Sequence, residues 1–410
     1  MNFETFNLHP SVMAGVRALG YSEPTPIQAK AIPPIIEGRD VIGQAQTGTG
    51  KTAAFILPIL QRLQLGPRGR IRALIISPTR ELAEQTCEVI SGLGGKTGLR
   101  SLAVYGGVSM EQQTRKLRAG VDIVVACPGR LLDHLWKGTL NLEKLETLVI
   151  DEADRMFDMG FLPDTRNILK CILHKHQTLL FSATMPDDIR KLVLEVMDKP
   201  VTVQVDQTLP AKSVSHALYP VSPHLKTALL KAILKSVKTD SVLIFTRTKH
   251  RTERLAQQLE RDGYRVTSLQ GNLAQNRRQE ALDGFRDGSY KILVATDIAA
   301  RGLDILSISH VINYDMPDTT DAYIHRIGRT GRVNNNGDAL TLATSEDTEV
   351  VNAIEKILKK KIERRTLENF NYGTPPSPRV SARPGQNRRF NPERRFAPAR
   401  GGWVTAANTR

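Results

Sequence analysis

Residues 45–52 of the chain read Ala45-Gln46-Thr47-Gly48-Thr49-Gly50-Lys51-Thr52. The stretch follows a short apolar run and opens a helix, a context that favours anion binding. Two glycines let backbone N–H groups turn toward an anion, and the helix N-terminus adds positive dipole character. These features predict a phosphate-binding loop at the end of a strand. A glycine-rich turn without a ligand is the structural alternative.

The side chains of this loop suit a nucleoside triphosphate with Mg²⁺. Lys51 is expected to reach the β and γ phosphates, and Thr52 to ligate the ion. Further along, the apolar run 148–150 leads into Asp151-Glu152-Ala153-Asp154. We expect Asp151 to hold Mg²⁺ largely through water, and Glu152 to orient or deprotonate the attacking water. Taken alone, these acids also suit a solvated helix start.

Short apolar and β-branched runs recur along the chain, with helix-like stretches between them. They lie at residues 41–42, 73–76, 123–126, 148–150 and 179–181, and again at 242–245, 266–269, 292–295, 310–314 and 339–343. Strands that alternate with helices form parallel sheets covered on both faces. We therefore predict an α/β fold with two tandem parallel-sheet domains, 1–205 and 216–372. Residues 206–215 are the predicted linker.

The composition narrows the class of partner. The 410 residues include 57 Lys and Arg against 42 Asp and Glu, a net charge of +15, which favours a polyanion such as nucleic acid. The isolated Cys87, Cys127 and Cys171 indicate neither disulfides nor zinc, and imply a reducing compartment. No signal-peptide pattern or membrane-spanning run is present. We expect a soluble, cytoplasmic monomer with no membrane partner.

With these motifs in place, residues 3–358 resemble the DEAD-box RNA helicase family, and in overall pattern its bacterial RhlE-like branch. The family's loop also begins with alanine, as here at Ala45. The resemblance implies two RecA-like domains that use ATP and Mg²⁺ to separate RNA strands locally. Residues 20–28 resemble the family's Q motif, in which Tyr21 would stack on adenine and Gln28 would hydrogen-bond its edge. Phe3 could share the packing role.

Three more stretches of the first domain resemble motifs that bind the RNA backbone. Backbone amides, Thr and Arg suit phosphate and ribose contacts. Where the family commonly has Thr before Pro-Gly-Arg, this chain has Cys127, which puts one sugar-phosphate hydrogen bond in question. The stretches are Pro78-Thr79-Arg80-Glu81-Leu82-Ala83, Gly106-Gly107 and Pro128-Gly129-Arg130.

Ser182-Ala183-Thr184 resembles the family motif that couples hydrolysis to strand separation. Its two hydroxyls are expected to hydrogen-bond carboxylates of the acidic tetrad, including Asp154, across the sheet. Hydroxyls after a buried strand also cap helices, which is the structural alternative.

The second domain carries four stretches that resemble family motifs. Residues 323–332 hold three arginines broken by two glycines, which suits neither a core nor an ordinary helix. By resemblance, Arg329 and Arg332 are arginine fingers that reach the γ phosphate when the domains close. Asp304 would contact the ribose, and His325 would link the nucleotide and RNA sides. The other stretches are Gln275-Asn276-Arg277-Arg278, Ala295-Thr296-Asp297 and Arg301-Gly302-Leu303-Asp304, of which Gln275, Arg278 and Thr296 would bind RNA.

This distribution predicts an ATPase site that is complete only when the domains close. ATP and RNA each bridge both domains, so each should raise the other's affinity. A DNA helicase or remodeller is a second hypothesis, which stimulation by poly-RNA against poly-DNA would separate. An ATP-gated RNA clamp without turnover is a third, and intact Glu152, Arg329 and Arg332 argue against it. The family suggests ribosomal precursors or RNA-decay proteins as partners.

Residues 373–410 form a predicted disordered tail, because Pro, Gly, Asn and Arg dominate it and little can be buried. It holds eight arginines against one acid, Glu393. Phe390, Phe396 and Trp403 are interleaved with them, a composition that stacks on bases while following phosphates. The tail is expected to tether RNA without sequence preference. A solvated solubility tail is the alternative.

Overall fold

The computed structural model describes residues 2–46, 48–205, 214–237, 241–300, 308–330 and 337–373, apart from the side chains of residues 298, 300 and 321. Both predicted domains belong to one compact unit, Met1–Asn371. Several predicted features lie outside the described residues: Thr47, Asp304, Arg332, residues 206–213 of the linker and residues 374–410 of the tail.

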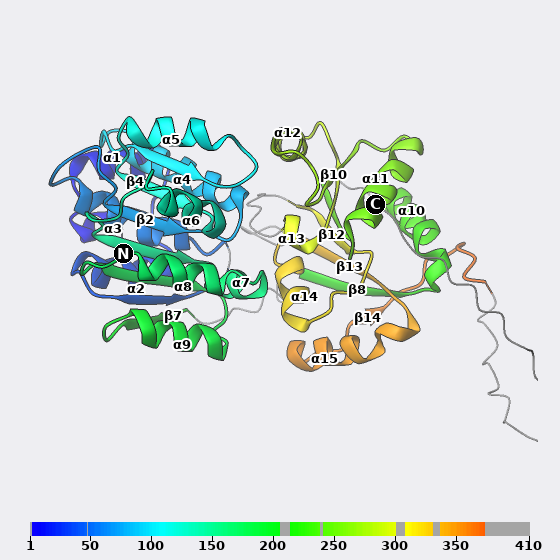
Figure 1. The fold of residues 1–410 in the computed structure, drawn as a ribbon. Coiled ribbons are helices and arrows are strands. Elements are labelled where there is room, and N and C mark those ends of the chain that lie inside the picture. Colours follow the sequence, from blue (N-terminus) through cyan, green and yellow to red (C-terminus); the bar gives the residue numbers. More distant parts are fainter. Residues whose placement is uncertain are drawn as a thin grey trace, which may run out of the picture. The chain divides into compact units, whose positions relative to one another are not determined.

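The first sheet has seven parallel strands in the order β3-β4-β2-β5-β6-β1-β7 (Figure 1). The central strands β2, β4, β5 and β6 are buried along their whole length, because helices cover both of their faces. The strands are β1 (Val41–Gln44), β2 (Ala73–Ile76), β3 (Ser101–Val104), β4 (Ile123–Ala126), β5 (Thr147–Asp151), β6 (Gln177–Ser182) and β7 (Val201–Gln204).

Two apolar clusters pack against the two faces of this sheet. On one face Phe55 meets Phe181, with ring centroids 5.2 Å apart, and the 3-10 helix η1 and helices α1 to α4 supply the cover. Helices α5 to α9 cover the other face. These elements are η1 (Phe3–Phe6), α1 (Pro10–Ala18), α2 (Pro26–Ile36), α3 (Lys51–Leu63), α4 (Arg80–Gly94), α5 (Met110–Arg118), α6 (Pro128–Trp136), α7 (Ala153–Asp158), α8 (Leu162–Lys170) and α9 (Asp187–Val196).

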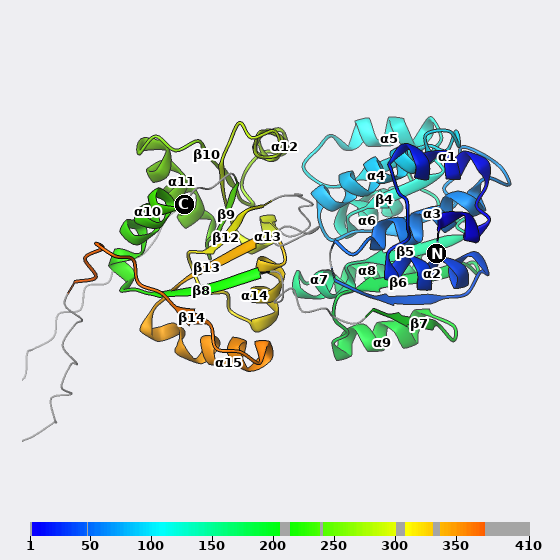
Figure 2. The same cartoon turned by 180° about the vertical axis from the view of Figure 1, so that it is seen from behind.

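The second sheet also has seven parallel strands, in the order β10-β11-β9-β12-β13-β8-β14 (Figure 2). Taken in chain order, its strands occupy the same positions as those of the first sheet. They are β8 (Val214–Pro220), β9 (Val242–Phe245), β10 (Val266–Leu269), β11 (Ile292–Ala295), β12 (His310–Asn313), β13 (Gly337–Ala343) and β14 (Glu363–Arg364).

The helices of the second domain also enclose its sheet. Helices α12 and α13 share one apolar cluster with β9 to β12, while α14 and α15 share another with β8 and β13. These elements are η3 (Pro223–Leu225), α10 (Lys226–Ser236), α11 (Lys249–Arg261), α12 (Gln275–Arg286), α13 (Asp297–Ala300), α14 (Thr320–Ile327), η4 (Ser345–Asp347) and α15 (Thr348–Leu358).

The predicted α/β fold with two tandem RecA-like parallel sheets is confirmed. Four strands were not predicted: β3, β7, β8 and β14. Strand β8 begins at Val214, so the last two residues of the predicted linker, 214 and 215, belong to this strand. The exact domain boundaries remain a prediction. Within the described residues, no helix is both long and apolar enough to cross a membrane.

Candidate active site

The predicted phosphate loop joins β1 to α3, and its backbone turns at two glycines. Gly48 has φ 84° and Gly50 has φ 92°, a region that side chains with a Cβ rarely adopt. The Gln28 side chain anchors the loop, because its Nε2 donates a hydrogen bond to the Gly50 carbonyl at 3.1 Å. A Cβ on Gly50 would lie 2.5 Å from that nitrogen. Glycine is therefore required at this position both by conformation and by space.

Gln28 has a second contact within the protein. Its Oε1 accepts from the Thr25 N–H at 2.9 Å, which caps helix α2. The side chain predicted to read adenine thus also links the start of α2 to the phosphate loop. Tyr21, predicted to stack on the base, lies 6.1 Å from Phe3 between ring centroids and is 36% exposed.

Lys51 is a buried cation at the start of α3. It is 6% exposed, and its Nζ has no hydrogen-bond partner among the described residues. Burial lowers the pKa of Lys51, while the nearby carboxylates of Asp151 and Asp154 act in the opposite direction. A buried ammonium without hydrogen bonds is unfavourable. The position therefore fits an anion such as a phosphate group, which would supply the missing acceptors.

Two carboxylates follow β5 beside this lysine. Asp151 ends the strand, and burial raises the pKa of its carboxyl group, opposed by the charges of Lys51 and Arg155. Its Oδ1 accepts from the Glu152 N–H at 3.0 Å. Glu152 has φ 50°, a left-handed backbone conformation that is uncommon for a residue other than glycine. The backbone thus turns sharply at the residue predicted to handle water.

The predicted Mg²⁺ ligands, Thr52 and Asp151, provide few protein oxygens. Within the described residues, no three His, Cys, Asp or Glu side chains gather into a potential metal site. Mg²⁺ usually keeps several waters and takes one or two carboxylates together with substrate phosphates. The residues present fit that mode of binding.

Arg155 belongs to the site but was not predicted. It forms an ion pair with the Glu152 carboxylate, and both side chains are 5% exposed. The only sequence signal was its spacing of three residues from Glu152, which also occurs in ordinary helical ion pairs. The pairing means that the carboxylate predicted to handle water is held by a positive charge in this structure.

Asp154 connects the acidic tetrad to β6. Its Oδ2 accepts from the N–H groups of Ala183 at 3.1 Å and Thr184 at 2.9 Å, and from the Thr184 hydroxyl at 3.2 Å. The Ser182 hydroxyl instead accepts from the Asp154 N–H at 3.1 Å and donates to the Thr184 carbonyl at 2.7 Å. Only one of the two predicted hydroxyl–carboxylate bonds therefore forms, because Ser182 is used by the backbone.

A small cavity joins this site to the second domain. Arg329 is 5% exposed, and its positive charge contributes to the lowered pKa of Lys51. His325 lies in α14, four residues before Arg329, and is half-buried. The cavity is lined by Lys51, Glu152, Asp154, Arg155, Ala183, His325 and Arg329. The structure thus brings the predicted finger Arg329 to the predicted phosphate-binding lysine.

Arg326 lies between His325 and Arg329 in the motif of residues 323–332, but no role was predicted for it. Its guanidinium forms two bonds of 2.6 Å to the Asp297 carboxylate, and its Nη1 donates to the Asp315 carbonyl at 2.7 Å. It also lies 5.0 Å above the centre of the Phe245 ring. These contacts fasten α14 to the ends of β9, β11 and β12. Arg326 therefore positions α14, and Arg329 lies in the turn that directly follows this helix.

The predicted RNA-binding residues of the two domains meet at Arg80. Its Nη1 donates to the Gln275 side chain at 3.3 Å, across the two domains. Gly107 has φ 85°, and a Cβ there would lie 2.3 Å from Arg80 Nη1. Thr79 caps α4 by accepting from the Leu82 N–H at 3.3 Å, so its hydroxyl has a structural use.

Arg278, another predicted RNA contact, is buried between the two domains. Its Nε donates to the Glu81 carboxylate at 2.7 Å, and its Nη1 donates to the Gln270 carbonyl at 3.0 Å. Arg278 is 8% exposed and Glu81 is 4% exposed. The residue therefore joins the domains through a buried ion pair, a partner that the sequence did not predict. Thr296, at the end of β11, is half-buried.

The third predicted RNA motif begins helix α6. Pro128 is its first residue, and Cys127 precedes it without a side-chain capping bond. Burial raises the pKa of Cys127 to about 12, so the thiol stays protonated at neutral pH. Arg130 donates to the Val108 carbonyl at 3.0 Å. Nothing would meet a Cβ on Gly129, so the backbone here is open to a ligand.

Sequence comparisons agree with this geometry. A family model for DEAD/DEAH box helicases matches residues 25–192, and one for the helicase conserved C-terminal domain matches residues 225–334. The DEAD-box ATP-dependent RNA helicase CshA of Geobacillus kaustophilus (strain HTA426) is 42% identical over 365 residues, 88% of this chain and 78% of that protein. The ATP-dependent RNA helicase DeaD of Buchnera aphidicola subsp. Baizongia pistaciae (strain Bp) is 41% identical over 373 residues, covering 91% and 62%.

Solved structures give the same result. S. cerevisiae Dbp5 bound to RNA and ADP BeF3 superimposes with a TM-score of 0.81 at 29% identity, covering 89% of this chain and 95% of that one. Mss116p bound to ssRNA and AMP-PNP gives 0.80 at 29% identity, covering 89% and 79%. The RhlE-like branch is a finer assignment that these relatives do not address. The chain belongs to the DEAD-box family of ATP-dependent RNA helicases.

Proposed function

We propose that this ATP-dependent RNA helicase clamps single-stranded RNA across both domains and separates short duplexes locally. The observation that supports this most is the shared cavity, in which Lys51 and Glu152 of one domain face Arg329 of the other. A site built from two domains can be complete only when they are together. ATP turnover would then depend on the same closure that holds RNA.

In the proposed hydrolysis step, Lys51 contacts the β and γ phosphates and Glu152 orients or deprotonates the attacking water. Before it can bind the water, the Glu152 carboxylate would have to release its ion pair with Arg155, which lines the same cavity. Arg329, with Arg332, would stabilise charge that develops on the transferred phosphate. Mg²⁺, held by Thr52 and Asp151 largely through water, would neutralise phosphate charge.

The RNA backbone would run over both domains near Arg80, Gln275 and Arg278. The bond between Arg80 and Gln275 and the ion pair between Arg278 and Glu81 link the two domains. Phosphate oxygens would compete for the same guanidinium groups. Binding of RNA would therefore exchange some protein contacts for phosphate contacts, so the gain in affinity is smaller than the number of arginines suggests.

The remaining predicted roles complete the proposal. Tyr21 and Gln28 would bind adenine, residues 45–50 the phosphates, and Asp304 the ribose. Asp154, Ser182, Thr184 and His325 would couple the two sites. Pro78, Thr79, Gly107, Pro128, Gly129, Arg130 and Thr296 would supply further RNA backbone contacts. We also propose a cytoplasmic monomer of the RhlE-like branch that remodels ribosomal precursors or assists RNA turnover.

The proposal is tested by ATP turnover with different polynucleotides. We expect poly-RNA to stimulate hydrolysis strongly and poly-DNA of equal length to do so weakly, because 2′-hydroxyl contacts distinguish the two. Equal stimulation by both would favour a DNA helicase or remodeller instead. RNA binding without measurable turnover would favour an ATP-gated clamp.

A further inference from the structure

The second domain contains a topological counterpart of the phosphate loop. Strand β8 occupies the place in its sheet that β1 occupies in the first, and α10 follows it as α3 follows β1. Lys226 is the first residue of α10, as Lys51 is of α3. Asp315 lies just beyond β12, which matches β5 and its final residue Asp151. The sheet thus repeats the Lys and Asp pair at equivalent strand ends.

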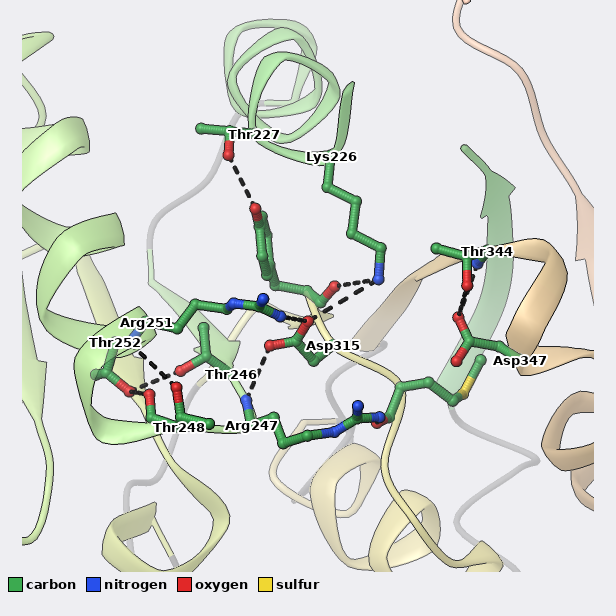
Figure 3. Close-up of polar contacts among 12 residues, drawn as sticks. Lys226, Thr227, Thr246, Arg247, Thr248, Arg251, Thr252, Asp315, Thr344 and Asp347 are labelled. Atoms are coloured by element: carbon green, nitrogen blue, oxygen red, sulfur yellow. Dashed lines mark hydrogen bonds and ion pairs between the residues drawn. The ribbon is translucent and has the colours of Figure 1, made fainter. Parts of the chain in front are cut away.

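These side chains form a cluster around one carboxylate (Figure 3). Lys226 Nζ donates to the Tyr314 carbonyl at 3.1 Å and lies 4.0 Å from Asp315 Oδ1. Arg251 Nη1 donates to the same oxygen at 2.6 Å, and the Arg247 N–H donates to Oδ2 at 2.9 Å. Asp315 therefore accepts hydrogen bonds on both of its carboxylate oxygens. Its single negative charge compensates only part of the positive charge of Lys226 and Arg251.

A cavity of about 410 Å³ opens beside this cluster. Four cationic side chains line it: Lys226, Arg247, Arg251 and Arg254. Of the acids in its wall, Asp315 is engaged as described, and Asp347 accepts from the N–H and hydroxyl of Thr344 at 2.7 and 2.8 Å. The third, Glu346, is exposed. Four cations against three acids give the lining a net positive charge, and a guanidinium is well suited to bind phosphate oxygens.

The surroundings of Lys226 lack the features with which the first domain is predicted to bind a nucleotide. Residues 221–225, between β8 and α10, contain no glycine, and Pro223 has no N–H to offer. The Tyr314 hydroxyl is bonded to Thr227 at 2.8 Å, and the ring is 8% exposed, so it cannot stack on a base. The cavity therefore offers charged side chains, but neither a glycine loop of backbone N–H groups for phosphates nor an accessible Tyr314 ring for a base.

From this combination we propose that the cavity between α10 and α11 binds a compact phosphate anion of the diphosphate class. Arg251, Arg254 and Lys226 would bind the phosphate oxygens. This cavity and the one shared by Lys51 and Arg329 have no lining residue in common, so the two sites are separate. A nucleotide is the second possible source of the same phosphate chemistry.

The test is calorimetric titration of inorganic diphosphate into the full chain, with the first site filled by saturating ADP. We expect one additional binding event. Arg254→Glu should weaken it at least about 10-fold, because an exposed arginine that contacts a charged ligand is replaced by a repelling charge. Gln258→Glu, also in the cavity wall, should weaken it in the same direction and serves if the first variant does not fold. Arg261→Glu makes the same charge change on α11 outside the cavity and should leave the affinity within about 2-fold.

Two further titrations separate the sources of phosphate. Inorganic phosphate should bind more weakly than diphosphate, and ADP should bind only once, at the first site. A second ADP bound in wild type and absent in Arg254→Glu would overturn the assignment to a compact anion. Absence of diphosphate binding in wild type, or equal weakening by Arg254→Glu and Arg261→Glu, would overturn the site itself.

Discussion

The two sheets of the chain have the same strand order, yet their equivalent lysines lie in different surroundings. Lys51 follows two glycines in left-handed conformation, and its Nζ has no hydrogen-bond partner among the described residues. Lys226 follows a loop that contains Pro223, and it donates to the Tyr314 carbonyl beside Asp315. The fold alone therefore does not make a nucleotide site. The glycines and the unpartnered ammonium of the first domain distinguish it from the second.

The domains also differ in which charges they bring to the shared cavity. The first supplies Lys51 and the carboxylates of Glu152 and Asp154, together with Arg155. The second supplies His325, on the helix α14 that Arg326 fastens, and Arg329, in the turn after that helix. Neither domain alone supplies the phosphate loop, the carboxylate proposed to orient water and the arginine finger. Variants of Arg329, of Glu152 and of the two equivalent lysines test this division, in order of decreasing expected effect.

The largest effect is expected for Arg329→Ala. Loss of an arginine finger lowers turnover by about 10³- to 10⁵-fold in well-studied phosphoryl-transfer enzymes. We expect a loss of at least about 10³-fold in RNA-stimulated kcat, measured by phosphate release at saturating ATP and RNA. The exposed Arg261→Ala is the control and should keep wild-type turnover. A normal rate for Arg329→Ala would remove the second domain from the catalytic site.

Glu152→Gln is expected to lower kcat by about 10²- to 10⁴-fold, as for loss of a general base. The amide keeps the shape of the side chain but cannot take a proton. Binding of ATP and RNA should persist, so single-turnover experiments should show a stable complex with unhydrolysed ATP. Wild-type turnover in this variant would assign the water to another residue.

The equivalent lysines give a matched pair of variants. Lys51→Ala should weaken ATP binding by about 10- to 100-fold, because the variant cannot form a charge-assisted hydrogen bond to phosphate. Lys226→Ala should leave ATP affinity within about 2-fold and instead lower the melting temperature, since Asp315 loses a buried neighbour. Both are measured by titration with a fluorescent ATP analogue and by thermal unfolding. Equal loss of ATP affinity in the two variants would contradict the distinction between the sheets.

The smallest effect is expected from removal of residues 373–410, whose predicted role rests on sequence alone. For every phosphate of a single strand that the shortened chain no longer binds, the slope of log affinity against log salt should fall by about 0.7. Turnover at saturating RNA should hardly change. Identical slopes for the full and shortened chains would leave the tail with only the solubility role. A large loss of turnover would place it in the catalytic unit.

Much of the fold was predictable because buried strands have an unmistakable composition. Strands β2, β4, β9, β10 and β11 begin and end where their apolar runs do. The missed strands β3 and β7 are the two edge strands of the first sheet and only partly buried, and β14, an edge strand of the second sheet, has two residues. Strand β8 was missed for another reason. It contains His216 and ends at Pro220, so its sequence lacks a continuous apolar run although it lies between β13 and β14.

The site shows the same division between local and distant signals. The phosphate loop and acidic tetrad are continuous in sequence, so their chemistry could be predicted. The pairs Arg278–Glu81 and Arg326–Asp297 join residues far apart in the chain, and either arginine could have been an exposed RNA contact. The Gln28 contact to Gly50 likewise joins residues of different motifs, 22 positions apart in the chain. Such pairings depend on how the strands are ordered, which no single motif contains.

The dependence of the site on both domains is tested most directly by linkage between ATP and RNA. The measurement is the RNA affinity of Glu152→Gln with and without ATP, together with its ATP affinity with and without RNA. If both ligands favour the same closed arrangement, each should raise the other's affinity by the same factor, about 5- to 150-fold. Arg329→Ala in the same background should reduce that factor, since the finger contributes to closure around ATP. Independent binding, with a factor of one in both directions, would contradict a site shared between the domains.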